Sequence, residues 1–151
     1  SGQPGYRSLK EDLLVEAKTI TLVQESWAKV EPISMTAADL FYAKLFELDP
    51  SLEPLFKGDM TQQKGKLMQM IGTAVKMLNR LDELVPVVVK LGERHIDYGV
   101  AAKDYDTVGA ALLDTLSKGL GDDFTPEVEK AWTAVYGVLA ETMLSAESTP
   151  A

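Results

Sequence analysis

One histidine occurs among the 151 residues of this chain, and its neighbours place it on an apolar surface. His95 shares a helical face with Leu84, Val88 and Leu91, because side chains three, four or seven residues apart lie on one side of a helix. An imidazole there loses its hydration, which costs free energy unless another group replaces the water. A neighbouring helix, a metal or a cofactor could replace it, so His95 is a candidate ligand as well as a candidate core residue.

Two further polar residues interrupt apolar stripes on other helices. Tyr42 follows Phe41 on one stripe, and Gln63 lies one turn before Leu67 on another. Taken singly, they fit a buried tyrosine bonded to a carbonyl and a glutamine at the edge of the solvent. Together with His95 they favour a cofactor held between helices, with the imidazole on one face and hydrogen-bond donors on the other. A haem iron needs that arrangement, since it takes one imidazole and keeps its far side open.

Helices must position these residues, because apolar residues recur at three- and four-residue spacing along nearly the whole chain. A capping-box pattern at Thr21 and Gln24 predicts the start of one helix, which Pro32 stops. The other expected helices cover about 34–48, 61–80, 82–99, 104–119 and 126–145, with a helical turn from Asp49-Pro50 to near Phe56. This pattern predicts one all-α domain of crossing helices over 19–151, and residues 1–18 form an N-terminal extension that is either mobile or a short helix.

The composition excludes several classes of function. A net charge of −8 argues against nucleic-acid binding, and the lack of cysteine argues against disulfides and thiolate-bound clusters. No window reaches the roughly 18 apolar residues of a membrane span. No signal peptide is visible, so we expect a cytoplasmic protein.

A set of short motifs resembles one family, the globins, over roughly residues 19–147. The motifs are Phe41-Tyr42 with Gln63, Asp49-Pro50, Phe56, Arg94-His95, Tyr98-Gly99-Val100, and Ala131-Trp132 followed by Tyr136-Gly137-Val138. Their detail is more similar to single-domain bacterial globins and to the globin domain of flavohaemoglobins than to animal myoglobins. The resemblance implies a globin fold of six to eight crossing helices around a haem pocket.

The resemblance also implies haem b, iron protoporphyrin IX, held without a covalent link. It makes His95 the iron ligand, and it places Phe56 against the porphyrin, Leu67 in the ligand pocket and Val100 at the ring edge. Lys66 or Arg94 could reach a haem propionate, although a solvated side chain is an equal alternative for both. Of the methionines near Gln63, we expect Met70 to be a core residue and Met68 to be partly exposed.

On the ligand side, Tyr42 and Gln63 would donate hydrogen bonds to O2, which implies slow dissociation and high affinity. NO and CO are further expected ligands. On the histidine side, Tyr105 and Glu147 match positions that bond to the iron-ligating histidine in flavohaemoglobin-like globins. A carboxylate there would make the imidazole a stronger donor and favour O–O bond chemistry. The alternative is that Glu147 is a solvated residue near the chain end.

Two classes of function follow from the resemblance. The first is a binding protein for O2 storage, transport or scavenging. The second is an enzyme, either a nitric oxide dioxygenase or a peroxidase-like protein. No G-x-G-x-x-G segment for a flavin or nicotinamide occurs in the 151 residues, so we expect such turnover to depend on a separate reductase.

Overall fold

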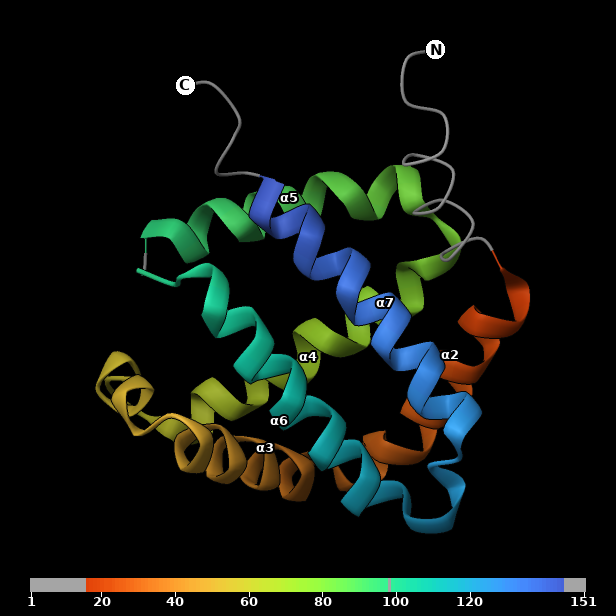
Figure 1. Cartoon of the computed structure of the whole chain (residues 1–151), viewed down its shortest axis with the longest axis horizontal. Coiled ribbons are helices and arrows are strands. Elements are labelled where there is room, and N and C mark those ends of the chain that lie inside the picture. Colours follow the sequence, from red (N-terminus) through yellow and green to blue (C-terminus); the bar gives the residue numbers. More distant parts are fainter. Residues whose placement is uncertain (1–15, 98, 146–151) are drawn as a thin grey trace.

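The computed structural model of the protein describes residues 16–97 and 99–145. They form six α-helices, named as in Figure 1: α2 (Ala17–Val30), α3 (Ser34–Leu48), α4 (Met60–Lys76), α5 (Leu81–Asp97), α6 (Ala102–Leu120) and α7 (Pro126–Leu144). Turns of 3-10 helix follow α2, α3, α4 and α6, at Glu31–Ile33, Pro50–Leu55, Met77–Asn79 and Gly121–Asp123. The all-α architecture expected from the sequence is confirmed.

Local chemistry explains several of these helix ends. Thr125 caps α7, because its hydroxyl accepts a 3.2 Å hydrogen bond from the backbone N–H of Val128. The carboxylate of Asp49 accepts a 3.1 Å hydrogen bond from the backbone N–H of Ser51 and so begins the turn after α3. Gly99, just beyond α5, has a φ of +83°, a conformation that strains any residue with a Cβ. These ends lie where the sequence predicts them.

The start of α2 differs from the prediction. The helix begins at Ala17, four residues before Thr21, so the expected capping box is wrong. The side chain of Gln24 instead reaches α4, where its Nε2 donates to the carbonyl of Val75 at 3.0 Å and to Oδ1 of Asn79 at 2.7 Å. The last residues of the expected extension therefore belong to α2. Residues 1–15 lie outside the described part of the chain.

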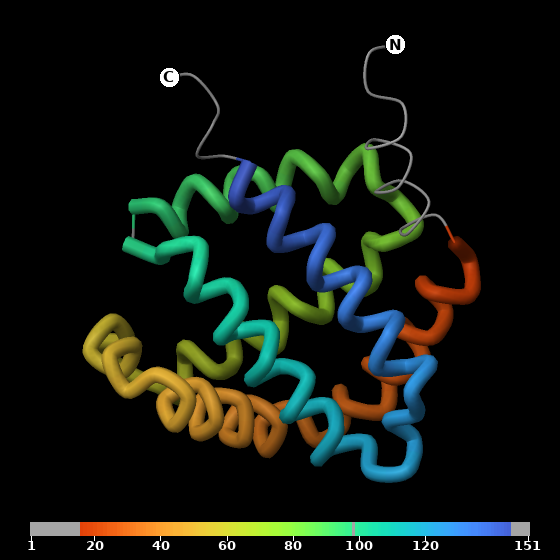
Figure 2. Tube along the Cα trace, in the orientation of Figure 1, coloured from red at the N-terminus to blue at the C-terminus, as the bar shows by residue number. Residues whose placement is uncertain are grey.

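The helices cross in layers. In Figure 1, α5 runs along the upper edge and α3 along the lower edge, with α4 between them and α6 and α7 crossing in front. Figure 2 shows α7 passing from α2 to α5, and α7 packs against both. Helix α3 packs against α4 and α6. Among the described residues, no helix is both long and apolar enough to cross a membrane.

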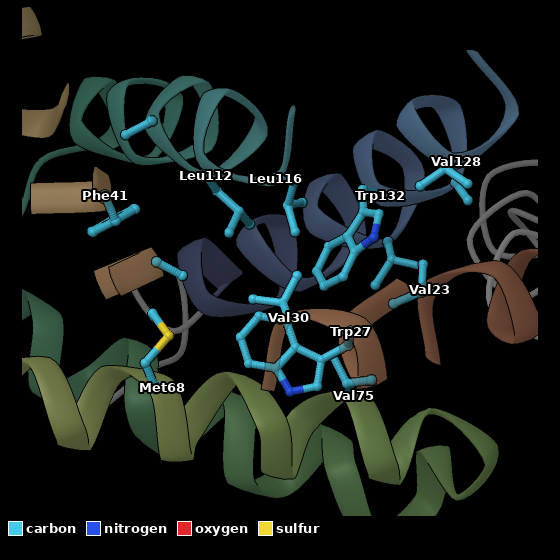
Figure 3. Close-up of a cluster of buried hydrophobic side chains, with 14 of the residues drawn as sticks. Val23, Trp27, Val30, Phe41, Met68, Val75, Leu112, Leu116, Val128 and Trp132 are labelled. Carbon is cyan, nitrogen blue, oxygen red and sulfur yellow. The ribbon is translucent and has the colours of Figure 1, made fainter. Parts of the chain in front are cut away.

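Two tryptophans mark the centre of the core. The rings of Trp27 and Trp132 lie 6.0 Å apart, and the indole N–H of Trp132 donates a 2.8 Å hydrogen bond to Oγ of Ser26. Figure 3 shows both rings among buried aliphatic side chains such as Val30 and Leu116, which come from α2 and α6. Burying each such aliphatic side chain contributes about 1.5–3 kcal/mol. This part of the core is built from α2, α6 and α7. The other helices, α3, α4 and α5, carry Tyr42, Gln63 and His95.

The buried face of α4 also differs from the prediction. Met68 is buried, with 8% of its surface exposed, whereas Met70 is 38% exposed, so the expectation that Met70 is a core residue and Met68 partly exposed is wrong. The buried positions of α4 are Met68, Gly72 and Val75, one helical face turned toward α2 and α3. A Cβ at Gly72 would lie 3.2 Å from Nε1 of Trp27, so glycine permits this close approach.

Candidate functional site

Tyr42 lies on α3 inside a cluster of aromatic rings. Its side chain is buried, with 4% of its surface exposed. The rings of Phe41 and Phe56 meet it edge to face, with centroids 5.1 and 5.4 Å away, and the ring of Phe46 lies at 5.9 Å. Edge-to-face contacts favour one orientation of the ring, because the positive edge of one ring faces the negative face of another. The cluster therefore fixes the direction in which the Tyr42 hydroxyl points.

The side chain of Gln63, in the first turns of α4, lies close enough to the Tyr42 hydroxyl to interact with it. Burial raises the pKa of Tyr42 above its ordinary value of 10.0, and the interaction with Gln63 opposes this shift. An amide N–H that donates to the phenol oxygen has that effect, because it stabilises the phenolate. The phenol is protonated at neutral pH and can itself donate. The structure brings these two predicted ligand-side residues together.

His95 lies in the last turn of α5, and its Nδ1 atom is 2.7 Å from the carbonyl oxygen of Leu91. A carbonyl can only accept a hydrogen bond, so Nδ1 carries the proton and donates it. In the neutral ring the lone pair is then on Nε2, the atom that binds a metal in such arrangements. The backbone N–H of Val100 donates to the carbonyl of His95 at 2.9 Å, and Val100 is half-buried beside it.

Two tyrosines connect His95 to α6 and α7. The ring of Tyr105, which is buried on α6, lies 6.1 Å from the ring of His95. The hydroxyl of Tyr136 on α7 donates a 2.6 Å hydrogen bond to the backbone carbonyl of Tyr105. A Cβ at Gly109 would lie 2.8 Å from the Tyr136 ring, so glycine makes room for this contact. Tyr136 belongs to one of the motifs that resemble the globins, but the sequence analysis predicts no role for it.

The other residue expected near the histidine, Glu147, lies outside the described residues. Tyr98 is outside them as well. Asp104, just before Tyr105, accepts a 2.8 Å hydrogen bond from the backbone N–H of Ala101 through its carboxylate. It therefore supports the start of α6.

A crevice of about 320 Å³ opens between α4 and α5. Helix α4 lines it with Lys66, Gln69, Met70, Thr73 and Ala74, the 3-10 turn after α4 adds Met77, and α5 lines it with Leu84, Val87, Val88 and Leu91. Its position explains why Met70 is exposed, since that side chain borders the crevice and not the core. Leu91 serves both features, because its side chain lines the crevice while its carbonyl holds the His95 ring. The lining is mostly apolar and its volume falls within the range of ligand sites.

The described residues fit the haem that the sequence leads us to expect. A flat apolar group needs an apolar space between two helices, and its iron needs an imidazole whose lone pair is on one defined nitrogen. The crevice and His95 meet these two needs. Leu67 and Phe56 are half-buried and pack against the core, and neither lines the crevice, whereas Lys66 and Arg94 are exposed, as groups that reach toward solvent must be.

Comparison with protein families finds one matching model, described as Globin, over residues 39–143. Curated relatives include the flavohemoproteins of Bacillus subtilis, 29% identical over 139 residues, and of Bacillus cereus, 30% identical over 139 residues. A flavohemoprotein of Rhodopirellula baltica is 27% identical over 137 residues. Each match covers 89% of this chain and 34% of the relative, so the chain spans about a third of their length.

A solved structure with a similar fold is that of flavohemoglobin from Malassezia yamatoensis with bound FAD and heme. The TM-score is 0.74 at 21% sequence identity, and the match covers 89% of this chain and 37% of that one. At this level of identity the likeness concerns the fold. The family model matched over residues 39–143 spans Tyr42, Gln63 and His95.

Proposed function

This chain belongs to the globin family and has its fold, and from that premise we propose that it is a haem protein that binds O2 reversibly with high affinity. Storage, transport or scavenging of O2 are the roles that such binding would serve. The relatives are named flavohemoproteins, and the similar solved structure holds haem, which supports haem as the cofactor. The crevice between α4 and α5 supports it independently.

His95 would hold the iron through Nε2, because its Nδ1 proton is bonded to Leu91. Phe56, Leu67 and Val100 would contact the ring, and Lys66 at the rim of the crevice would face a propionate. When bound, a haem would supply a ferrous iron that can take O2, NO or CO. The Leu91 carbonyl would keep the imidazole plane fixed and make its Nε2 a stronger donor.

The pair of Tyr42 and Gln63 carries the proposal of high affinity. Both side chains can donate to a polar diatomic ligand, the phenol through O–H and the amide through N–H. In a pocket that excludes water, each donated hydrogen bond would contribute about 1–2 kcal/mol, which is roughly five- to thirty-fold in ligand release. The aromatic rings around Tyr42 add to this, because they hold the donor in place before the ligand arrives.

Stopped-flow measurement of O2 dissociation from the reduced, haem-loaded protein tests the pair. We expect Tyr42→Phe and Gln63→Leu each to release O2 roughly five- to thirty-fold faster than the parent protein. Lys18→Gln is a suitable control, because it breaks an exposed 3.1 Å ion pair with Glu127 between α2 and α7 and leaves these side chains intact. Unchanged dissociation in both site variants would overturn the proposal.

Nitric oxide dioxygenation is the second candidate function. In that reaction one NO and one O2 give one nitrate with one electron, which a separate reductase must supply. A pocket that holds O2 through two donors suits it, because O2 must stay bound until NO arrives. The solved flavohemoglobin contains FAD as well as haem, and only 37% of that chain matches this one, which supports a flavin reductase as the electron source. The ring of Tyr105 beside His95 is compatible with peroxidase-like chemistry.

Turnover with a flavin reductase and NADPH distinguishes the two functions. A dioxygenase would consume NO continuously and form one nitrate for each NO, whereas a binding protein would consume about one equivalent and then stop. Tyr42→Phe should reduce the turnover rate if the pair holds O2 for the reaction. Sustained turnover would favour the enzyme over storage.

A further inference from the structure

The residues at the start of α4, where Gln63 lies, contribute little to the stability of their own helical turn. Thr61, Gln62 and Gly65 are exposed there. No atom outside the helix lies within 4 Å of the position a Cβ would take at Gly65, and a glycine inside a helix costs about 1 kcal/mol relative to alanine. The cap is a single 2.9 Å hydrogen bond from the backbone N–H of Thr61 to the carboxylate of Asp59. Contacts with other helices must therefore hold this segment in position.

One ion pair does join it to α3. Nζ of Lys64 lies 2.9 Å from Oδ1 of Asp39, and the Lys64 side chain is only 24% exposed. Within residues 16–97 and 99–145, no other ion pair joins α3 to α4. Lys64 follows Gln63 directly, and Asp39 lies one turn before Tyr42 on α3. The ion pair therefore joins the same two helix segments as the contact between Tyr42 and Gln63.

We infer that Lys64 and Asp39 are positioning residues that hold the first turns of α4 against α3 and thereby keep Gln63 at the Tyr42 hydroxyl. The inference rests on the proposed function, since only a ligand-binding Gln63 makes this position matter for release. Neither residue needs to touch the ligand. When the ion pair opens, the weakly held segment moves away more often, and the Gln63 amide is lost as a donor during those excursions.

This mechanism makes ligand release sensitive to salt. Asp39 is 64% exposed, so the pair is reached by dissolved ions. The screening length falls from about 30 Å at 0.01 M to about 3 Å at 1 M ionic strength, which weakens an exposed pair. O2 dissociation from the parent protein should therefore become faster with salt. Variants without the pair should release O2 quickly at every salt concentration.

The experiment uses the haem-loaded protein with Lys64→Gln, Asp39→Asn and the double variant. Exposed pairs of this kind change an equilibrium by up to about five-fold, so we expect O2 release to be about two- to five-fold faster in each single variant. The double variant should release O2 no faster than either single variant, because both remove one interaction. Lys64→Arg, which keeps the charge, should restore most of the parental rate.

Amide hydrogen exchange gives a second readout that does not depend on O2. The amides of residues 64–67 donate to carbonyls in the first turn of α4, so they should exchange about two- to five-fold faster when the ion pair is removed. Lys18→Gln is the matched control, because it also breaks an exposed pair between two helices, α2 and α7. It should alter neither O2 release nor exchange in α4.

The outcomes separate this inference from the proposed function. If Tyr42→Phe speeds O2 release but the Lys64 and Asp39 variants change neither release nor exchange, the positioning role is wrong and the proposed function stands. If neither Tyr42→Phe nor Gln63→Leu speeds O2 release, the proposed function fails, and with it the effect of the ion pair on release. Faster exchange at residues 64–67 would then support only a mechanical contact between α3 and α4 and would overturn the inference.

Discussion

The hydroxyl of Tyr136 donates a 2.6 Å hydrogen bond to the backbone carbonyl of Tyr105, and this contact joins α7 to α6. It holds the segment of α6 whose buried ring lies 6.1 Å from the ring of His95. The Tyr136 ring also fills the space that glycine leaves at Gly109. A residue of α7 thus fixes the surroundings of the candidate iron ligand, although it lies in neither α5 nor α6.

Replacing this tyrosine by phenylalanine should destabilise the protein measurably. Tyr136→Phe keeps the ring but removes the donor to Tyr105, so we expect the free energy of unfolding to fall by about 1 kcal/mol. Urea unfolding measures it. Thr142→Val is the control in the same helix, because the Thr142 hydroxyl bonds only to a carbonyl of its own helix, that of Val138. An equal loss in both variants would contradict a special role for the contact between helices.

Gly92 should tolerate no larger side chain. A Cβ at this position in α5 would lie 2.3 Å from the carbonyl oxygen of Met143 in α7, and a backbone atom cannot move aside like a flexible side chain. Gly92→Ala should therefore force α5 and α7 apart and lower the free energy of unfolding by about 1–3 kcal/mol. Urea unfolding followed by circular dichroism measures the loss.

Gly137 provides the control for this substitution. It lies on α7, and no atom outside that helix lies within 4 Å of a Cβ built there. Gly137→Ala should raise the free energy of unfolding by up to about 1 kcal/mol, since alanine favours a helix over glycine. If both substitutions moved stability in the same direction, the close approach of α5 to α7 would not be the cause.

Helix boundaries set by local chemistry could be predicted from the sequence, and those set by distant contacts could not. The cap at Thr125 and the turn at Asp49 are built from neighbouring residues, so the sequence indicates them. The start of α2 was mispredicted because Gln24 bonds to Val75 and Asn79 in another helix and does not cap its own. The sequence pattern of α2 does not indicate that Val75 and Asn79 are the partners of Gln24.

The same distinction applies to the site. Periodicity alone identified His95, Tyr42 and Gln63 as unusual, because each is polar on an apolar stripe, and the structure brings the side chains of Tyr42 and Gln63 together. The exposed position of Met70 could not be predicted, because an apolar side chain that borders a crevice has the same spacing as one in a core. The contact between Lys64 and Asp39 depends on how α3 and α4 cross, which the sequence does not specify.

Stability should decrease above pH 10. Burial raises the pKa of both Tyr42 and Tyr136 above the ordinary value of 10.0. In the unfolded chain these phenols lose their protons from about pH 10, whereas the folded protein keeps them, so rising pH favours unfolding. The contribution is constant below pH 10 and is lost as the pH rises toward the folded pKa values. Urea unfolding between pH 8 and pH 11 measures this decrease.

Tyr42→Phe separates this effect from general alkaline denaturation. The variant lacks one of the two buried phenols, so its stability should fall less steeply above pH 10 than that of the parent protein. Below pH 9 the two stability curves should run parallel, since no proton is lost from either phenol there. Identical slopes above pH 10 would show that the Tyr42 phenol titrates no differently in the folded and unfolded chains.

The hydrogen bond between Nδ1 of His95 and the Leu91 carbonyl can be tested by replacing the side chain with a free molecule. His95→Gly should lose most of its haem affinity, and added imidazole should restore it, because the free ring can bind iron through one nitrogen and donate to the carbonyl through the other. The position of the Soret band during haem titration measures this recovery. Circular dichroism checks that α5 survives the glycine.

1-Methylimidazole distinguishes a bonded ring from one that merely fills space. It can bind iron through its unsubstituted nitrogen, but its methyl group leaves no N–H for the Leu91 carbonyl. Its rescue of His95→Gly should be weaker than that of imidazole by about 1 kcal/mol, or roughly five-fold in the concentration needed. Equal rescue by the two molecules would mean that the carbonyl contributes nothing to holding the ring. Weaker rescue would show that α5 orients its histidine through its own backbone.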